Sequence, residues 1–98
     1  MQRPPEIRLN HFQLAILLDN DQKSFLNHVT AENVFCRQCG GTAMQGIVID
    51  EVYLTDLNDV LVVGTCKKCN GEVARLFEFG EDKAFYAKAN EFRKSIGK

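Results

Sequence analysis

Three segments in the second half of the chain are rich in β-branched and aromatic residues, a composition typical of β-strands. They span residues 46–54, 60–64 and 72–79. Residues 55–59, Thr-Asp-Leu-Asn-Asp, have the composition of a turn between the first two strands. Within residues 60–63 every position is apolar, so both alternating sets of side chains avoid water. We therefore expect a three-stranded antiparallel sheet with both faces at least partly covered.

The two ends of the chain show helical patterns that supply these covers. Phe85, Ala89, Phe92 and Ile96 recur at the spacing of one helix face and predict a helix over residues 81–97. Near the other end, residues 10–30 are predicted to be a helical region, with Asn10 as its N-cap. The predicted fold class is α+β, with the sheet flanked by N-terminal and C-terminal helices.

The N-terminal helical region contains an interruption at Asp19-Asn20-Asp21, which is poor helix-forming sequence. Two interpretations stay open here. Either one helix continues through the triplet, or the helix breaks and Asp21 caps a second helix that ends near His28. The preceding residues 1–9, which include Pro4-Pro5, are expected to form an extended tail.

Length and hydropathy limit the class of protein. The chain has 98 residues, which predicts a single domain over residues 1–98. No apolar run approaches the ~20 residues that span a membrane, so no membrane contact is expected. The first residues lack the apolar core of a signal peptide, and we therefore expect a cytoplasmic location.

Four cysteines, the only ones in the chain, form two Cys-x-x-Cys pairs separated by 26 residues. The pairs are Cys36/Cys39 and Cys66/Cys69. Gly40 and Asn70 follow them directly, and these residue types tolerate the left-handed backbone of a sharp turn. Four thiolates can enclose one Zn²⁺ in a closed tetrahedral shell. The pattern therefore predicts a metal site with all four cysteines as ligands.

These residues give the segment 34–79 a resemblance to the zinc-ribbon superfamily. The resemblance implies two zinc knuckles joined by a β-hairpin, followed by a further strand, with Zn²⁺ in a structural role. The central gap exceeds the usual ~15–20 residues between such pairs, so we expect a long hairpin.

Alternatives to zinc use the same four side chains. A rubredoxin-like iron centre has this ligand set and would make the protein an electron carrier. Two disulfides would suit a secreted protein. A thioredoxin-like redox pair normally opens a helix, whereas Gly40-Gly41 and Asn70-Gly71 disfavour helix after both pairs.

The sequence offers no set of residues for catalysis, so we predict that the protein is not an enzyme. Four cysteine ligands leave no open position on the metal. His11 and His28 lack the following glutamate of the zinc deaminases and are expected on helix surfaces or caps. Asp50 and Glu51 are adjacent in a predicted strand, where neighbouring side chains point to opposite faces and share an ion poorly.

The charge of the chain is unevenly distributed, although its net value is only −1. Residues 1–64 carry −4 (four basic, eight acidic) and residues 65–98 carry +3 (eight basic, five acidic). Three basic residues lie between the metal ligands: Arg37, Lys67 and Lys68. Their role is either to offset the −2 charge of a zinc–tetrathiolate or to contact phosphate. A nucleic-acid-binding surface would use five basic residues. These are Lys67, Lys68, Arg75, Lys83 and Lys94. The other interpretation is a solvated surface.

The sequence thus favours a non-catalytic protein-interaction module that contacts another protein and is supported by a structural zinc ribbon. The alternative function is nucleic-acid binding in transcription or RNA processing, and an iron electron carrier is the third. The sequence does not indicate an oligomeric state.

Overall fold

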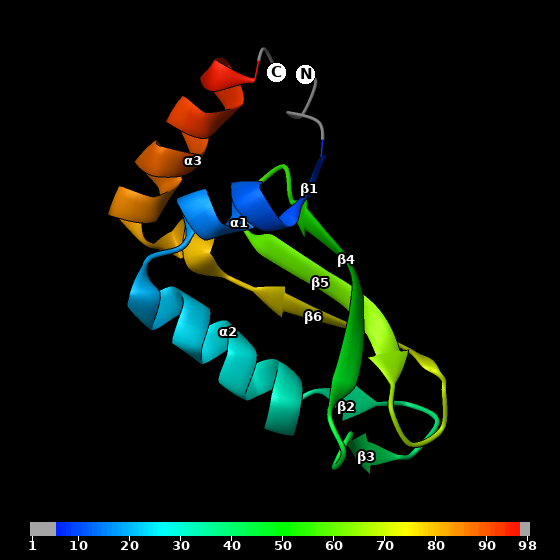
Figure 1. Ribbon diagram of the computed structural model, residues 1–98. Coiled ribbons are helices and arrows are strands. Elements are labelled where there is room, and N and C mark those ends of the chain that lie inside the picture. Colours follow the sequence, from blue (N-terminus) through cyan, green and yellow to red (C-terminus); the bar gives the residue numbers. More distant parts are fainter. Residues whose placement is uncertain (1–5, 97–98) are drawn as a thin grey trace.

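The computed structural model describes residues 6–96 (Figure 1). Its strands are β1 (Ile7–Leu9), β2 (Phe35–Cys36), β3 (Gly41–Thr42), β4 (Ile47–Leu54), β5 (Val60–Cys66) and β6 (Glu72–Phe77). Its helices are α1 (His11–Leu17), α2 (Asn20–Glu32), the 3₁₀ helix η1 (Phe79–Glu81) and α3 (Lys83–Ser95). The predicted α+β class is confirmed.

The main sheet is antiparallel and has four strands in the order β1-β4-β5-β6, one more than predicted. The three predicted strands are β4, β5 and β6. The additional strand, β1, lies in the stretch expected to be an extended tail. Ile7 and Leu9 are buried while Arg8 between them is exposed, so three residues suffice for a one-sided edge strand. A separate two-stranded sheet, β2-β3, surrounds the first cysteine pair.

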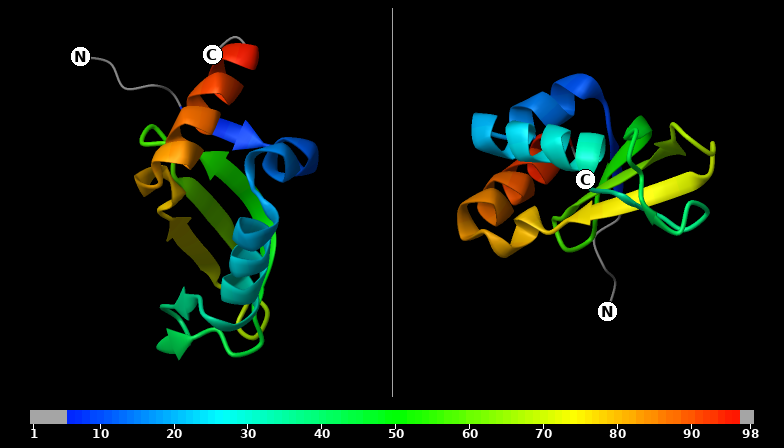
Figure 2. Two further views of the ribbon diagram at one scale, coloured as in Figure 1. Left: turned by 90° about the vertical axis from the view of Figure 1, so that its left-hand side faces the viewer. Right: turned by 90° about the horizontal axis from the view of Figure 1, so that it is seen from below.

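The helices α1, α2 and α3 lie on the same side of the main sheet (Figures 1 and 2). Several cross-strand neighbours on this side are buried; examples are Leu54 opposite Val60, and Val60 opposite Phe77. Cross-strand neighbours on the other side are partly exposed, as Leu61 opposite Leu76 shows. The outer face is thus partly covered, as predicted, but the expectation that the helices flank both faces of the sheet is wrong. Apolar side chains on the outer face are only half-buried, and Leu76 is 45% exposed.

The N-terminal helical region breaks into two helices, and the cap lies at Asp19 rather than Asp21. The Asp19 side chain accepts a hydrogen bond from the Gln22 backbone, and the Gln22 side chain accepts one from the Asp19 backbone. This reciprocal capping box satisfies two N–H groups at the helix start. Asn10 caps α1 in the same way with Gln13, as predicted. The second helix continues to Glu32, beyond the predicted end at His28.

The C-terminal helix α3 joins the hydrophobic core through its predicted stripe, and Phe85, Ala89 and Phe92 are buried. It begins at Lys83 rather than residue 81, because Asp82 accepts hydrogen bonds from the backbone of Ala84 and Phe85. The last residue of the expected range, residue 97, lies outside the described residues.

Candidate metal centre

The structure brings the four cysteine sulfurs into one cluster, in which all lie within 4.8 Å of one another. The distance is 3.5 Å from Cys36 Sγ to Cys69 Sγ and 3.8 Å from Cys39 Sγ to Cys66 Sγ. A regular tetrahedron with Zn–S bonds of about 2.3 Å has edges of about 3.8 Å. The cluster therefore has the dimensions of a single-ion site with four sulfur ligands.

Two turns of the same construction present the sulfurs. In the first, Gly40 takes a positive φ of 76° and donates its N–H to the Cys36 carbonyl at 2.9 Å. In the second, Asn70 takes a φ of 62° and donates to the Cys66 carbonyl at 2.9 Å. The left-handed turns expected after each pair are thus present.

The β4–β5 hairpin carries the second cysteine pair back to the first. Its two strands pair from Leu54 opposite Val60 to Ile47 opposite Cys66, with one register shift between Ile49 and Glu51. Residue 47 follows the first knuckle almost directly, so this register fixes Cys66 beside the first pair. The long hairpin expected from the sequence spacing is observed.

The thiols have a mixed environment that favours binding of a cation. Cys36 and Cys66 are fully buried, whereas Cys39 is exposed at the surface. Backbone N–H groups point at the sulfurs, for example from Cys39 to Cys36 Sγ and from Gly71 to Cys69 Sγ, each at 3.4 Å. Such donors stabilise negative charge on sulfur.

The thiols differ in pKa because each has different hydrogen-bond partners within the cluster. Hydrogen bonding to the Cys69 side chain raises the pKa of Cys39 to about 12. Backbone hydrogen bonds from Cys69 and Lys68 lower the pKa of Cys66 to about 7. Four sulfurs this close do not all ionise without a cation, because each thiolate opposes the next. A divalent metal would supply that charge.

The four cysteines are free thiols in the structure, without disulfides between them. Among residues 6–96, no histidine or carboxylate joins them. His28 lies on α2, where Nδ1 is 3.3 Å from Glu32 Oε2, and His11 is the first residue of α1. Neither histidine belongs to the cluster, as predicted from the sequence.

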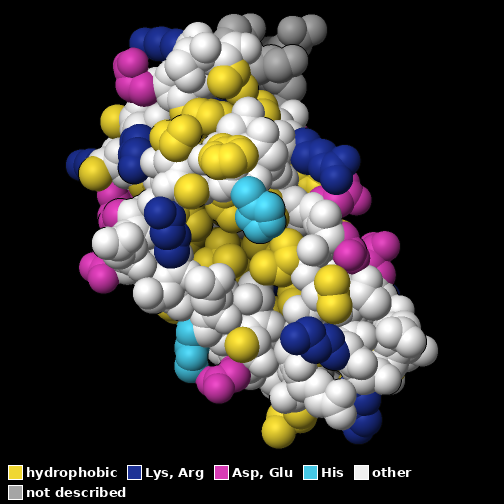
Figure 3. All heavy atoms as spheres, in the orientation of Figure 1, with side chains coloured by type: hydrophobic (Ala, Val, Ile, Leu, Met, Phe, Trp, Pro, Cys, Tyr) yellow, Lys and Arg dark blue, Asp and Glu magenta, His cyan; other side chains and the backbone are white. Residues whose placement is uncertain are grey.

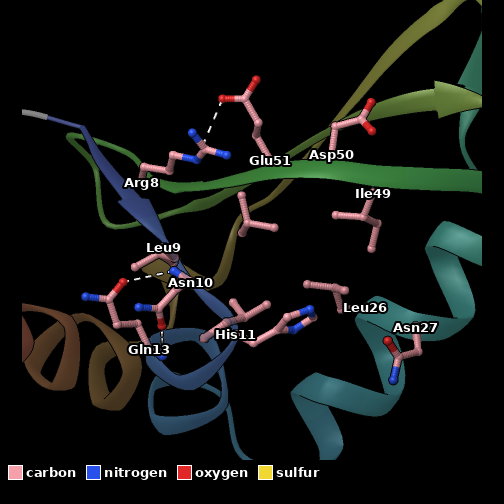
Figure 4. A pocket seen from close by; sticks show the side chains of 12 residues that line it. Arg8, Leu9, Asn10, His11, Gln13, Leu26, Asn27, Ile49, Asp50 and Glu51 are labelled. Atoms are coloured by element: carbon pink, nitrogen blue, oxygen red, sulfur yellow. Dashed lines mark hydrogen bonds and ion pairs between the residues drawn. The ribbon is translucent and has the colours of Figure 1, made fainter.

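The acidic pair Asp50 and Glu51 lies on one face of the sheet, so the prediction of opposite faces is wrong. The register between β4 and β5 shifts between Ile49 and Glu51, which indicates a β-bulge with Asp50 as the extra residue. Asp50 accepts a hydrogen bond from Thr65 Oγ1 at 2.8 Å, and Glu51 accepts one from the Tyr53 hydroxyl. Both partners belong to the outer face. Figure 4 shows both carboxylates pointing away from Ile49.

The five basic residues predicted to form a nucleic-acid-binding surface lie on three different parts of the fold. Lys67 and Lys68 are exposed in the second knuckle, at the start of β6. Lys83 and Lys94 lie on α3, which follows the far end of β6. Arg75 is opposite Val62 on the helix-covered face, and its guanidinium lies 5.8 Å from the centre of the Phe77 ring.

A hollow that the sequence did not predict opens between α1, α2 and β4 (Figures 3 and 4). Its volume is about 590 Å³. The apolar residues that line it are Leu9, Leu14, Leu26, Ile49 and Val52. In the sequence these apolar residues look the same as residues of a filled core. No local pattern therefore predicts that the space between them is open.

A scan against protein-family models, a search of curated proteins and a search of solved structures found no match to this chain. The four-cysteine cluster is consistent with a zinc-ribbon-like site, and this likeness depends on geometry alone. Within residues 6–96, no helix has the length and apolar character needed to cross a membrane.

Proposed function

We propose that this chain is a non-catalytic protein-interaction module whose knuckles are held in place by one structural Zn²⁺. The observation that carries this proposal is the closed set of four thiols within 4.8 Å. Catalytic zinc sites keep a position for water or substrate, whereas a shell of four cysteines leaves none. Binding of the ion stabilises the two knuckles by joining segments that are distant in the chain.

Zinc is the proposed metal because a Cys₄ tetrahedron is its common structural site. Iron in the same ligand set would make the protein an electron carrier. Absorbance separates the two directly, since a ferric tetrathiolate is red and the zinc form is colourless. Elemental analysis of protein produced without added metal should give one zinc per chain.

Exposed apolar side chains on the first knuckle support contact with another protein. Phe35, at the start of β2, is 63% exposed, and Met44, just after β3, is 82% exposed. Aromatic and methionine side chains are enriched at protein interfaces. Both residues are attached to the part of the chain that the metal would hold rigid.

The proposal is tested by affinity capture from the cells that produce the protein. We expect the wild type to retain specific partner proteins and Cys66→Ser, which lacks one ligand, to lose them together with the metal. Capture of no protein by the metal-loaded wild type would contradict the interaction role. A colourless protein that contains no metal would contradict the structural role of zinc.

Nucleic-acid binding remains a second candidate, favoured by the exposure of Arg37, Lys67 and Lys68 on the knuckles. Binding through such residues depends on phosphate contacts and weakens steeply with salt. Retention on heparin at low salt, lost when Lys67 and Lys68 are both changed to Glu, would support this candidate.

A further inference from the structure

The hollow between α1, α2 and β4 exposes apolar side chains on a sheet face that the helices otherwise cover. Ile49 projects toward Leu26 and His11 across the open space (Figure 4). It lies on the covered face of β4 yet remains 41% exposed, because it borders the hollow. In the space-filling view the floor of the hollow is hydrophobic (Figure 3).

Beside the hollow, half of strand β4 has a neighbour on one side only. The edge strand β1 pairs with Val52, Tyr53 and Leu54, and then the chain turns into α1. Among the described residues, no strand pairs with the outer side of residues 47–51. An unpaired strand edge is a template for another extended chain.

The register shows which backbone groups face this edge. Lys67 donates its N–H to the Gly46 carbonyl at 3.1 Å, whereas Cys66 donates its N–H to the Gly71 carbonyl at 2.9 Å and so faces away from β4. Ile47 and Cys66 are therefore a non-hydrogen-bonded pair of the β4–β5 ladder. Hydrogen-bonded and non-hydrogen-bonded pairs alternate along antiparallel strands. The N–H and C=O groups of Ile47 and Ile49 therefore point outward, away from β5.

We propose that the free edge of β4 and the adjoining hollow bind an extended segment of a partner protein by β-strand addition. In this mode, main-chain hydrogen bonds supply affinity, and pockets for alternate side chains supply specificity. The proposal rests on the proposed function as a protein-interaction module, and it identifies the surface and the chemistry of the bound segment.

The two faces of β4 predict an alternating apolar and basic segment. Side chains of an added strand that point to the helix side would enter the apolar hollow beside Ile49. Their neighbours would point to the outer face, beside the carboxylates of Asp50 and Glu51. On that face Arg8 Nε lies 3.9 Å from Glu51 Oε2, while the Asp50 carboxylate accepts a hydrogen bond from the Thr65 hydroxyl group. Lysine or arginine at these positions would complement the charge.

A second copy of this chain fits the edge less well. Two-fold pairing of β4 with its counterpart would place Asp50 and Glu51 of both copies at one interface. Like charges directly across a pair of strands are destabilising. A partner with basic residues at alternate positions avoids this repulsion.

The metal centre and this edge are connected through the start of β4. Ile47 is opposite Cys66, one of the four proposed metal ligands. Gly46 has a φ of 82° and packs closely on α2, since a Cβ at this residue would lie 3.0 Å from the Ala31 carbonyl oxygen. A metal-held knuckle therefore fixes the position of the free edge relative to α2. We expect loss of the metal to weaken binding of the segment.

The test uses the full metal-loaded chain and a fluorescent peptide of nine alternating Lys and Val residues, followed by anisotropy. We expect saturable binding, weaker by about tenfold or more for Ile49→Arg, which places a charge in the hollow. Leu57→Arg is the matched control, since Leu57 is 66% exposed in the β4–β5 turn away from the edge. Asp50→Lys should weaken binding of this Lys/Val peptide and strengthen binding of a Glu/Val peptide of the same length.

Amide hydrogen exchange supplies the decisive readout. The N–H groups of Ile47 and Ile49 should exchange more slowly when the Lys/Val peptide is bound. Binding without this protection, equal binding by Ile49→Arg, or absence of binding would overturn the inference. Protection that grows with protein concentration without peptide would show a second copy as the occupant and would also overturn it.

Failure of this inference is distinguishable from failure of the proposed function. If wild type and Ile49→Arg capture the same cellular partners equally, the module binds proteins through another surface and only the edge assignment fails. If the metal-loaded wild type captures none, the interaction role itself fails.

Discussion

Arg93 Nε donates a hydrogen bond to Asn58 Oδ1 at 2.9 Å and thereby joins helix α3 to the β4–β5 turn. Both residues are buried, and Asn58 has a positive φ of 61°. The Arg93 guanidinium also donates to the Thr55 carbonyl oxygen, and Asn58 Nδ2 donates to Asn90 Oδ1 at 3.0 Å. Burial lowers the pKa of Arg93 from its very high ordinary value. This network closes the end of the sheet that lies farthest from the cysteine cluster.

Replacing Arg93 with Met should cost about 3 kcal/mol of unfolding free energy, because it leaves buried acceptors on Asn58 and Thr55 without their charged donor. Urea denaturation measures the change. Lys94→Met is the control, since Lys94 is exposed and its ion pair with Glu91 at 3.6 Å should contribute under about 0.5 kcal/mol. Equal stability of the two variants would contradict a stabilising role for the buried network.

Gly64→Ala should destabilise the sheet, because a Cβ at residue 64 would lie 2.2 Å from the Val48 carbonyl oxygen on the paired strand. Relieving that clash requires movement of backbone near the β-bulge, at an expected cost of about 1–3 kcal/mol. Gly41→Ala is the control, since its Cβ would meet no atom within 4 Å. Thermal unfolding of both variants tests the difference, and a Gly64→Ala variant as stable as Gly41→Ala would refute it.

Cys66→Ser should abolish stoichiometric metal binding and remove the structural support of both knuckles. Cys66 is fully buried and links the end of β5 to the cluster. Apparent binding energies of structural zinc are comparable to the whole stability of a small domain, so loss of most of the cooperative unfolding transition is expected. Elemental analysis and circular dichroism measure both effects. Thr65→Ser, which keeps the hydroxyl that bonds Asp50, should behave as wild type.

Metal affinity should fall as the pH is lowered. Neighbouring thiols raise the pKa of Cys39 to about 12, so this thiol is protonated at neutral pH in the absence of metal. The pKa of Cys69 is also raised, by burial, despite an opposing hydrogen bond from the Gly71 backbone. Each thiol must lose its proton when the metal binds, so protons compete with the metal. Release of these two protons alone predicts a change of about a hundredfold in affinity per pH unit.

Competition with a chromophoric chelator at pH 6.5, 7.0 and 7.5 measures this dependence. The wild type should hold zinc more tightly at each higher pH. A pH-independent affinity would mean that the cysteine thiols do not release protons on binding, and therefore that they are not the ligands.

The sequence was most informative where a local pattern determines a local structure. The Cys-x-x-Cys pairs with Gly40 and Asn70 predicted both knuckles, because the turn geometry depends on only five residues each. The α3 stripe and the Asn10 cap followed from helical spacing and capping chemistry in the same way. To predict the metal cluster, it was necessary to add only a hairpin that returns the chain and places the second cysteine pair beside the first.

The features that were missed depend on tertiary contacts or on single-residue irregularities. The bulge at Asp50 puts Asp50 and Glu51 on one face, and strict alternation along a strand does not reveal it. Arg93 lies in the last turn of α3, and its buried partner Asn58 belongs to a turn 35 residues earlier, which no local pattern around Arg93 indicates. The one-sided sheet also depends on helix placement, which the apolar run at residues 60–63 does not encode.

The central claim, one structural metal ion held by four sulfurs, is tested most directly by X-ray absorption at the zinc edge on protein purified without added metal. We predict one zinc per chain with four sulfur neighbours at about 2.3 Å and no nitrogen or oxygen ligand. Absence of metal, or a first shell with fewer than four sulfurs, would contradict the account.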